Sequence, residues 1–248
     1  MNTVDLSWLK ATPFAHRGLH TGDEKIPENS MKAFKNAIEH NYAIELDVQV
    51  TKQKQVVVFH DEDLARMCGG HERSITTVTS DELQHFYRLQ GTEQKIPLLS
   101  EVLACVNGRV PILIEIKPTR VKNACRIILN ELIGYTGLLA IQSFDPFILG
   151  WFANRTPRLI RGQLACSFKE EQMNAMKKYL LRTCKLNIIS KPHFFAYNAT
   201  DMPVSFLERK RKNGTPVLGW TITSTEEQKK ASQYCDNIIF EGYYAANG

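Results

Sequence analysis

The sequence lacks the long hydrophobic runs that membrane-spanning helices need. No stretch of its 248 residues approaches the roughly 18 to 20 consecutive apolar residues required to cross a bilayer. The opening segment "MNTVDLSWLKATPFAH" holds neither a basic region nor a long apolar region, so we expect no secretory signal. These absences favour a cytoplasmic protein with no stable membrane insertion.

The sequence also lacks closely spaced cysteine pairs of the C-x-x-C type, and it lacks the glycine motif of dinucleotide-binding folds. Its six cysteines form no C-x-x-C motif and have no regular spacing, which favours reduced structural thiols over disulfides or a zinc site. No G-x-G-x-x-G is present, and only "AHRGLHTG" resembles a glycine-rich turn. The net charge is only +5, and basic residues cluster only at 208–214. We therefore expect no nucleic acid as a partner.

No linker rich in proline, glycine or serine interrupts the chain. We therefore expect a single domain over residues 1–248, with the irregular stretch at about 61–98 as an insertion. A length of about 200 to 250 residues is common for α/β barrels, and the chain is long enough to bury a full core.

Short apolar runs alternate with amphipathic, helix-like segments along the whole chain. The apolar runs predict strands at 13–16, 43–48, 55–59, 110–116, 138–144, 158–164, 186–190, 215–222 and 236–240. Eight strands remain if the run at 55–59 is a hairpin partner or an extension of the run at 43–48. The pattern favours the α/β class, as a (β/α)8 TIM barrel with a small insertion after the second strand, over an open doubly wound sheet.

Charged residues two positions apart occur in two of the predicted strands. In "AIELDV" Glu45 and Asp47 point to one face, and in "ILIEIKP" Glu115 and Lys117 do the same. Strands of a parallel barrel are covered on both faces, so carboxylates there need a cation. A set of oxygen ligands favours Mg²⁺ or Ca²⁺ over zinc, and strand ends converge at the mouth of a barrel, where active sites form.

Histidines end two other predicted strands, in "AHRG" and "FHD". A single histidine at a strand end is commonly structural, but His16 and His60 form a pair. Two histidines near a divalent ion suit phosphoryl transfer, one taking a proton from the nucleophile and the other giving one to the leaving oxygen. Arg17 supplies a planar fork for phosphate oxygens.

The order of these motifs resembles the glycerophosphodiester phosphodiesterase family. The motifs that carry the resemblance are "HRG", "PENSMKAF", "IELDVQVT", "VVVFHDEDLAR", "IPLLSEVL", "LIEIKP", "IQSFDP", "LGWTIT" and "DNIIFEG". The resemblance covers nearly the whole chain. It implies a TIM barrel with a small insertion, one divalent cation, and hydrolysis of glycerophosphodiesters to sn-glycerol 3-phosphate and an alcohol.

The resemblance also implies roles for seven residues. They are His16 and His60 as the acid/base pair, Arg17 and Lys117 on the phosphate, and Glu45, Asp47 and Glu115 as metal ligands. Members of the family are thought to use a glycerol hydroxyl as an internal nucleophile, which gives a cyclic phosphate. The sequence leaves that step open.

Other motif residues have two interpretations each. Glu28 and Asn29 in "PENS" either orient His16 or Arg17, or Asn29 and Ser30 only cap a helix. We include Gln142, Phe144 and Trp220 as substrate-binding candidates, because each lies near a predicted strand end. For Trp220, an aromatic residue in a barrel, the alternative of packing in the core is favoured.

Two other functions compete with the hydrolysis of a small glycerophosphodiester. A phospholipase-like enzyme acting on lysophospholipids or phosphoinositides would use the same site, but the mostly polar insertion favours a water-soluble, small-molecule substrate. A phosphoester-binding barrel without turnover would have lost a histidine or a metal ligand, and none is missing. The preferred alcohol, the choice between Mg²⁺ and Ca²⁺ and the oligomeric state stay open. The segment "TKQKQ" departs from the family in lacking an Asp-Gly hairpin turn.

Overall fold

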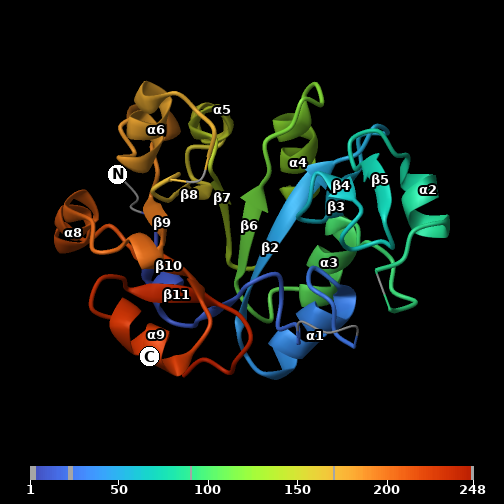
Figure 1. The fold of residues 1–248 in the computed structure, drawn as a ribbon, viewed down its shortest axis with the longest axis horizontal. Coiled ribbons are helices and arrows are strands. Elements are labelled where there is room, and N and C mark those ends of the chain that lie inside the picture. The colour runs from blue at the N-terminus through green and yellow to red at the C-terminus, as the bar shows by residue number, and fades with distance from the viewer. Residues whose placement is uncertain (1–3, 22–24, 90, 170, 247–248) are drawn as a thin grey trace. The chain divides into compact units, whose positions relative to one another are not determined.

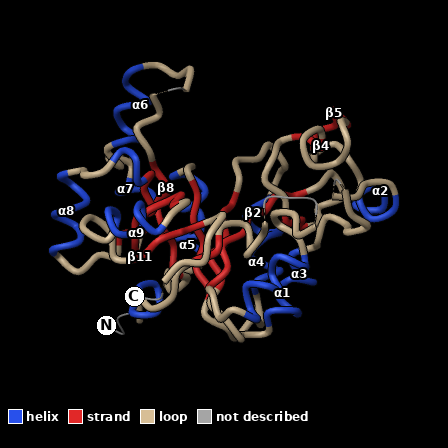
Figure 2. The backbone as a smooth tube through the Cα atoms, turned by 60° about the horizontal axis from the view of Figure 1, so that its bottom comes forward, coloured by secondary structure: helices blue, strands red, loops and turns tan. Residues whose placement is uncertain are grey.

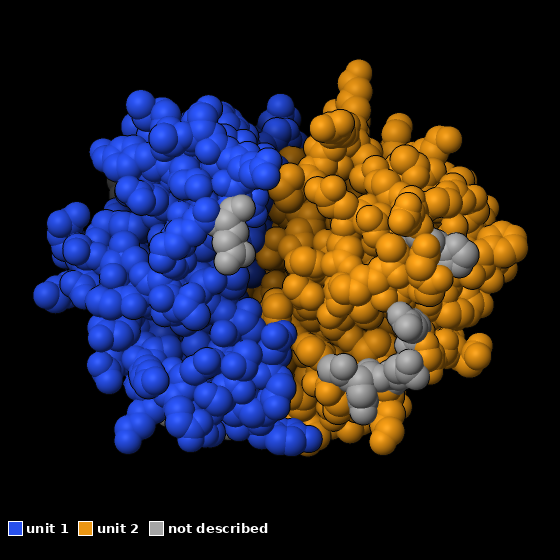
Figure 3. Space-filling model, in the orientation of Figure 1, with its two compact units in different colours: residues 1–14, 139–248 blue, residues 15–138 orange. Residues whose placement is uncertain are grey.

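The structure is a computed structural model that describes residues 4–21, 25–89, 91–169 and 171–246. The chain divides into two compact units, which Figure 3 shows in different colours. Unit 1 comprises residues 1–14 and 139–248, and unit 2 comprises residues 15–138. The short strand β1 (Phe14–Ala15) contains the boundary between them.

The sheet of unit 2 is built around one long buried strand. Strand β2 (Ala43–Val50) pairs in parallel with β6 (Ile112–Ile116) and antiparallel with β3 (Val56–Val58) (Figure 1). Every residue of β2 and β6 is buried, as expected for strands covered on both faces. The run at 55–59 is therefore the hairpin partner of the second strand.

The turn between β2 and β3 forms without an Asp-Gly pair. Lys54 takes the left-handed conformation, with φ of 66°, and its backbone N–H donates to the Thr51 carbonyl at 2.9 Å. The helices of unit 2 among the described residues are α1 (Met31–Glu39), α2 (Ser80–His85), α3 (Leu99–Val106) and α4 (Ala124–Leu132).

The segment at 61–98 has its own apolar core. It contains the small antiparallel pair β4 (Asp63–Leu64) and β5 (His71–Ser74), followed by α2. Leu64, Ile75 and Leu83 are fully buried in a cluster that also includes Val57 of β3. Burial of these side chains holds the segment against the hairpin strand that precedes it.

Unit 1 contains a run of five parallel strands in sequence order. They are β7 (Leu139–Ser143), β8 (Ile160–Ala165), β9 (Phe194–Asn198), β10 (Val217–Ile222) and β11 (Asn237–Phe240). The helical elements are η1 (Ser7–Lys10), α5 (Pro146–Arg155), α6 (Ala175–Arg182), α7 (Asn187–Ser190), η2 (Ala199–Asp201), α8 (Ser205–Lys212) and α9 (Thr225–Ala231).

The predicted strand at 186–190 is wrong. The segment forms the single helical turn α7, and the strand lies later, as β9. A five-residue apolar run does not by itself distinguish a strand from a buried helical turn. Here the close packing of α7 on α5 favours the helical turn. A Cβ atom on Gly150 of α5 would lie only 2.8 Å from Cγ2 of Ile189 in α7.

None of the helices among the described residues is long and apolar enough to cross a bilayer. All six cysteines lie in the described part of the chain, and none of them forms a disulfide.

Candidate functional site

Three carboxylates from β2 and β6 converge in unit 2. The parallel register places Asp47 beside Glu115, and Glu45 lies two residues earlier on the same face of β2. One oxygen from each of the three lies within 4.8 Å of the others, and all three side chains are buried. The predicted convergence of these residues is confirmed.

The three carboxylates have different electrostatic surroundings. Burial raises the pKa of Glu45 well above its usual value, and the charges of Asp47 and Glu115 raise it further. Burial also raises the pKa of Glu115, to about 7. Burial alone would raise the pKa of Asp47 too, but Lys117 and Arg17 bring it below its usual range. Such a buried, oxygen-only donor set fits a hard divalent cation.

Lys117 lies between two of these carboxylates. Its Nζ is 2.9 Å from Oδ1 of Asp47 and donates to Oε1 of Glu115 at 2.6 Å. Burial alone would lower the pKa of Lys117, but these two partners raise it, so the ammonium stays charged.

The turn at Arg17 is fixed onto the strand that carries Glu45. The backbone N–H of Arg17 donates to Oε2 of Glu45 at 3.1 Å, and that of Gly18 donates to the Glu45 carbonyl at 3.1 Å. Gly18 has φ of 80°, and a Cβ there would lie 2.9 Å from Cβ of Ala33. Both the backbone conformation and the close approach to α1 therefore require glycine.

The motif "PENS" combines both predicted roles in different residues. Asn29 donates from Nδ2 to Oδ2 of Asp47 at 2.9 Å, whereas Ser30 caps α1 by accepting from the Ala33 N–H at 3.1 Å. Glu28 accepts from Nη1 of Arg17 at 2.6 Å. Asn29 therefore orients a carboxylate of the site, and the cap is the residue after it.

His60 follows β3 and is held by its neighbour. Nδ1 of His60 is 2.8 Å from Oδ1 of Asp61, and the Phe59 N–H donates to the Asp47 carbonyl at 2.9 Å. Burial lowers the pKa of His60, which favours the neutral ring. With the Nδ1 proton shared with Asp61, Nε2 of the neutral ring carries the lone pair. Both His60 and His16 lie near enough to Asp47 to stabilise its negative charge.

Arg66 joins two acidic groups of the site and was missed in the sequence. Its Nε and Nη2 donate to Asp61 at 2.7 and 2.9 Å, and its Nη1 and Nη2 donate to Glu28 at 2.9 and 2.7 Å. Asp61 contacts the histidine at position 60, and Glu28 contacts Arg17. Arg66 and Glu28 are 38 residues apart, so no local sequence pattern indicated that they are partners.

Gln49 was also missed, although a signal for it was present. Its Nε2 donates to the carbonyls of Phe59, His60 and Asp61, at 3.1, 3.3 and 2.6 Å. The alternation that singled out Glu45 and Asp47 continues to Gln49, which lies on the same face of β2. The buried amide therefore fixes the loop that carries His60.

The three predicted substrate-binding residues lie in unit 1: Gln142 in β7, Phe144 directly after β7, and Trp220 in β10. Gln142 is buried in β7. The ring of Phe144 meets Trp220 edge to face at 5.6 Å and Phe168 at 6.0 Å. The indole Nε1 of Trp220 is buried and has no hydrogen-bond partner among the described residues.

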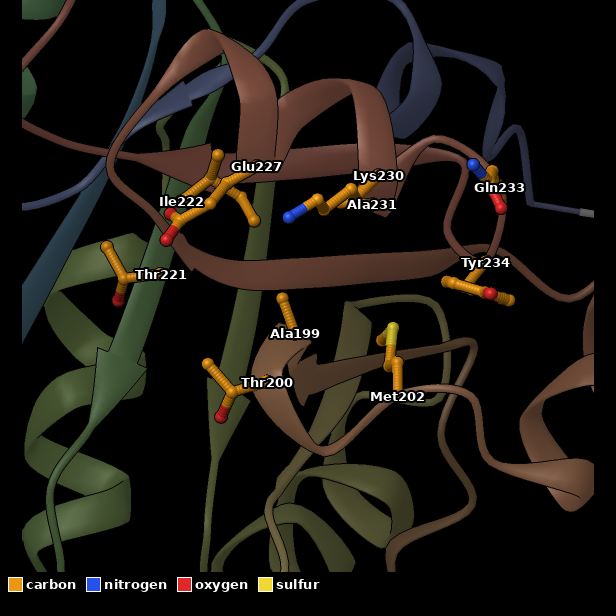
Figure 4. Close-up of a pocket in the computed structure, with 10 residues that line it drawn as sticks. All are labelled: Ala199, Thr200, Met202, Thr221, Ile222, Glu227, Lys230, Ala231, Gln233 and Tyr234. Carbon is orange, nitrogen blue, oxygen red and sulfur yellow. The ribbon is translucent and has the colours of Figure 1, made fainter.

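A separate cavity of about 310 Å³ lies in unit 1, between η2, the end of β10 and α9 (Figure 4). No site residue predicted from the sequence lines it. In Figure 4, Thr200 and Met202 lie below the cavity and Lys230 of α9 lies above it.

The sequence matches a known family over most of its length. Residues 16–240 match the model of the glycerophosphoryl diester phosphodiesterase family. Over 238 residues the chain is 28% identical to the glycerophosphodiester phosphodiesterase of Caldanaerobacter subterraneus, covering 90% of each chain.

Solved structures agree with this match. The glycerophosphodiester phosphodiesterase of Thermotoga maritima is 28% identical, with a TM-score of 0.69 and 92% of each chain covered. A phosphodiesterase of Oleispira antarctica, solved with the product sn-glycerol-3-phosphate, is 21% identical with a TM-score of 0.76, covering 93% of this chain and 92% of that one. The fold is the closed eight-stranded parallel barrel with surrounding helices, which confirms the predicted fold class.

Proposed function

Because the chain belongs to the glycerophosphoryl diester phosphodiesterase family, we propose that it hydrolyses glycerophosphodiesters to sn-glycerol 3-phosphate and an alcohol at the site in unit 2. The observation that carries the proposal is the convergence of three buried carboxylates within 4.8 Å. Two histidines and two cations surround them. We also propose that residues 1–248 act as one domain, since the family match runs through both units.

Glu45, Asp47 and Glu115 would hold one divalent cation, Mg²⁺ or Ca²⁺. Burial and mutual repulsion make the three carboxylates unfavourable together without a positive charge. Lys117 already neutralises part of this charge. When bound, the ion supplies charge stabilisation for the phosphate oxygens.

Arg17 and Lys117 bind the phosphate in this proposal. The Arg17 guanidinium is fixed by Glu28 and Asp47, with Nε 3.4 Å from Oδ2 of Asp47. Both cations are already oriented before substrate binds, so little side-chain entropy is lost when the phosphate enters.

His60 acts as the general base and His16 as the general acid. Burial favours neutral His60, and Asp61 holds its Nδ1, so Nε2 is available to accept a proton from the nucleophile. The nucleophile is water in a direct hydrolysis, or the glycerol 2-hydroxyl if a cyclic phosphate forms first and water then opens it. His16 then donates a proton to the leaving oxygen of the alcohol. Asp61 and Arg66 are positioning residues, because they act through His60 and through the Glu28 partner of Arg17.

Gln142, Phe144 and Trp220 are the proposed contacts to the substrate in unit 1. The supporting observation is the buried indole N–H of Trp220, which has no partner among the described residues and is suited to donate to a hydroxyl or phosphate oxygen. The Phe144 ring against Trp220 offers an apolar surface for the glycerol carbons.

A panel of glycerophosphodiesters tests the proposal. The alcohol is varied among choline, ethanolamine, glycerol and inositol, and the released glycerol phosphate is quantified with EDTA, with Mg²⁺ and with Ca²⁺. We expect ion-dependent release of sn-glycerol 3-phosphate. Full turnover in EDTA, or release of the free alcohol from none of the diesters, would contradict the proposal.

A further inference from the structure

Helix α6 differs from every other helix of eight residues or more in the described part of the chain, because none of its residues is buried. It follows β8 through the loop that leaves the carboxyl end of that strand. Figure 2 shows α6 projecting beyond α7 and α8, its neighbours in unit 1. The helix is about 12 Å long at 1.5 Å per residue.

The segment around α6 is strongly basic. Residues 173–191 contain five basic residues and no acidic residue. Unit 1 as a whole has 16 basic and 10 acidic residues, whereas unit 2 has 15 and 16. The positive charge of the chain is therefore concentrated in unit 1, where α6 lies in a basic stretch separate from the basic cluster at 208–214.

The cations of this segment have few partners. Lys177, Arg182 and Lys185 are exposed and form no ion pair with any described residue. The ammonium of Lys178 donates to the Lys169 carbonyl at 3.3 Å and likewise has no acidic partner among the described residues. The charge of α6 is thus not neutralised by ion pairs with the part of the chain that the structure describes.

Apolar side chains of α6 face the solvent. Met176 is 67% exposed and Tyr179 is 39% exposed. They are three residues apart and therefore lie on one face of the helix. The Tyr179 ring contacts two cations, Nζ of Lys185 at 4.8 Å and Cζ of Arg182 at 5.9 Å from its centroid. An aromatic ring and a thioether thus lie beside a cluster of positive charges.

We propose that α6 docks the protein on the surface of an anionic lipid bilayer. Met176 and Tyr179 enter the headgroup region, and Lys177, Lys178 and Arg182 contact lipid phosphates. A short amphipathic helix with basic residues beside exposed apolar side chains is the pattern of an interfacial helix, and each Lys or Arg near an anionic surface strengthens binding. This surface lies outside the catalytic machinery and the inference does not rest on the proposed function.

A bilayer fits these features better than a second copy of the chain. Two copies meeting through α6 would bring five like charges of each chain together with no acidic residue in the segment to neutralise them. Lipid phosphates provide the opposite charge and the acyl boundary accepts the apolar side chains. A nucleic acid would satisfy the charge but not the exposed methionine, and it is an outcome of the test below.

The test is sedimentation of the full chain with vesicles. Vesicles of phosphatidylglycerol and phosphatidylcholine are compared with vesicles of phosphatidylcholine alone. We expect binding to the anionic vesicles only, with the bound fraction falling as salt shortens the range of the attraction. Absence of binding to anionic vesicles at low salt, or equal binding to both vesicles, would overturn the proposal.

Charge reversal locates the binding surface. Lys177→Glu/Lys178→Glu is compared with Lys229→Glu/Lys230→Glu on α9, which makes the same change of net charge elsewhere in unit 1. We expect the α6 variant to bind anionic vesicles about tenfold or more weakly, while the α9 variant loses much less. Equal losses in both variants would show that overall charge, and not α6, sets the binding.

An apolar pair of variants separates a bilayer from a nucleic acid. Met176→Ser/Tyr179→Ser is compared with Phe86→Ser/Ile133→Ser, which removes two other exposed apolar side chains. Only the α6 pair should weaken vesicle binding severalfold. Tighter binding of a single-stranded oligonucleotide than of anionic vesicles at equal salt would overturn the bilayer in favour of a nucleic acid. Turnover of a small soluble diester should stay unchanged in all four variants, which separates this test from that of the catalytic proposal.

Discussion

The cations of the candidate site in unit 2 are paired with carboxylates, whereas those of α6 in unit 1 are not paired with any described carboxylate. In unit 2, Arg17, Arg66 and Lys117 each contact two carboxylates. In α6, Lys177 and Arg182 have no acidic partner among the described residues. For Arg17 and Lys117, whose side chains are 16% and 14% exposed, burial explains the difference, because a buried charge without a partner costs several kcal/mol, whereas an exposed charge is solvated. Arg66 is 49% exposed, and its pairing instead follows from the two carboxylates beside it. Paired cations are fixed for chemistry, and unpaired cations are available to an external anion.

The largest effect is expected from removing a carboxylate of the triad. Glu45→Ala should lower ion-dependent turnover by about 10³-fold or more, because the ion and the phosphate charge it stabilises are both lost. The free energy of unfolding of the ion-free protein should be unchanged or higher, since a like charge is removed from beside Asp47 and Glu115.

Matched assays of turnover and of urea unfolding check this divergence. Glu39→Ala, at the exposed end of α1, is the control and should change neither quantity. If Glu45→Ala kept wild-type turnover in chelator-treated buffer, the three carboxylates would have no ion to hold.

The histidines should give the next effect. His16→Ala and His60→Ala should each lower kcat by about 10²-fold to 10⁴-fold. Because burial lowers the pKa of His60, the acidic limb of the kcat/KM profile should lie below the ordinary histidine value of 6.5. A p-nitrophenyl leaving group should partly rescue the His16 variant, the proposed acid, and not the His60 variant.

The exposed His85→Ala is the control for the histidine variants and should retain wild-type kinetics. If the substrate with the p-nitrophenyl leaving group rescued the His16 and His60 variants equally, the assignment of acid and base would be contradicted.

Replacing Arg66 tests whether a residue that does not contact the substrate positions His60 and Arg17 through Asp61 and Glu28. Arg66→Ala should lower kcat by roughly 10-fold to 100-fold with a smaller change in KM, because both Glu28 and Asp61 lose a forked partner. Arg66→Lys restores the charge but not the fork, so it should recover only part of kcat. Arg73→Ala, whose partner Glu82 is outside the site, is the control. An unchanged kcat in Arg66→Ala would show that the contacts of Arg66 with Glu28 and Asp61 are surface ion pairs without a role in catalysis.

The smallest effect is a pH-dependent stabilisation by the ion. A carboxyl whose folded pKa is raised contributes stability below its unfolded pKa and loses it as pH rises through the folded pKa, which is about 7 for Glu115. The ion-free protein should therefore lose stability from this group between about pH 4.5 and pH 7. An ion binds the deprotonated form, so it should raise Tm more at pH 8 than at pH 5.5.

The expected size of this shift follows from mass action. An ion at 100 times its Kd adds about 2.7 kcal/mol, which is roughly 5 to 10 °C of Tm for a chain of this size. Thermal unfolding with and without Mg²⁺ or Ca²⁺ at the two pH values measures it. A larger shift at pH 5.5 would contradict the assigned ligands.

The sequence predicted the parts of this architecture that depend on local pattern. Alternation along β2 and β6 was enough to find Glu45, Asp47 and Glu115, since side chains two apart share a face of a strand. The same alternation extends to Gln49, which was missed only because an amide carries no obvious chemistry.

The features that the sequence did not predict depend on tertiary contacts. Arg66 acquires its role through Glu28, 38 residues away, and no local pattern encodes that distance. The run at 186–190 reads as a strand until the packing of Gly150 against Ile189 makes it the helical turn α7. Long-range pairing and close packing therefore account for what the sequence did not predict.

A paired measurement of turnover and vesicle binding tests the division between the two regions most directly. Glu45→Ala and Lys177→Glu/Lys178→Glu are each assayed for hydrolysis of a soluble glycerophosphodiester with the ion present, and for sedimentation with anionic vesicles. We expect Glu45→Ala to lose turnover and keep vesicle binding, and the α6 variant to keep turnover and lose vesicle binding. Loss of both properties in either variant, with circular dichroism showing it folded, would contradict the account.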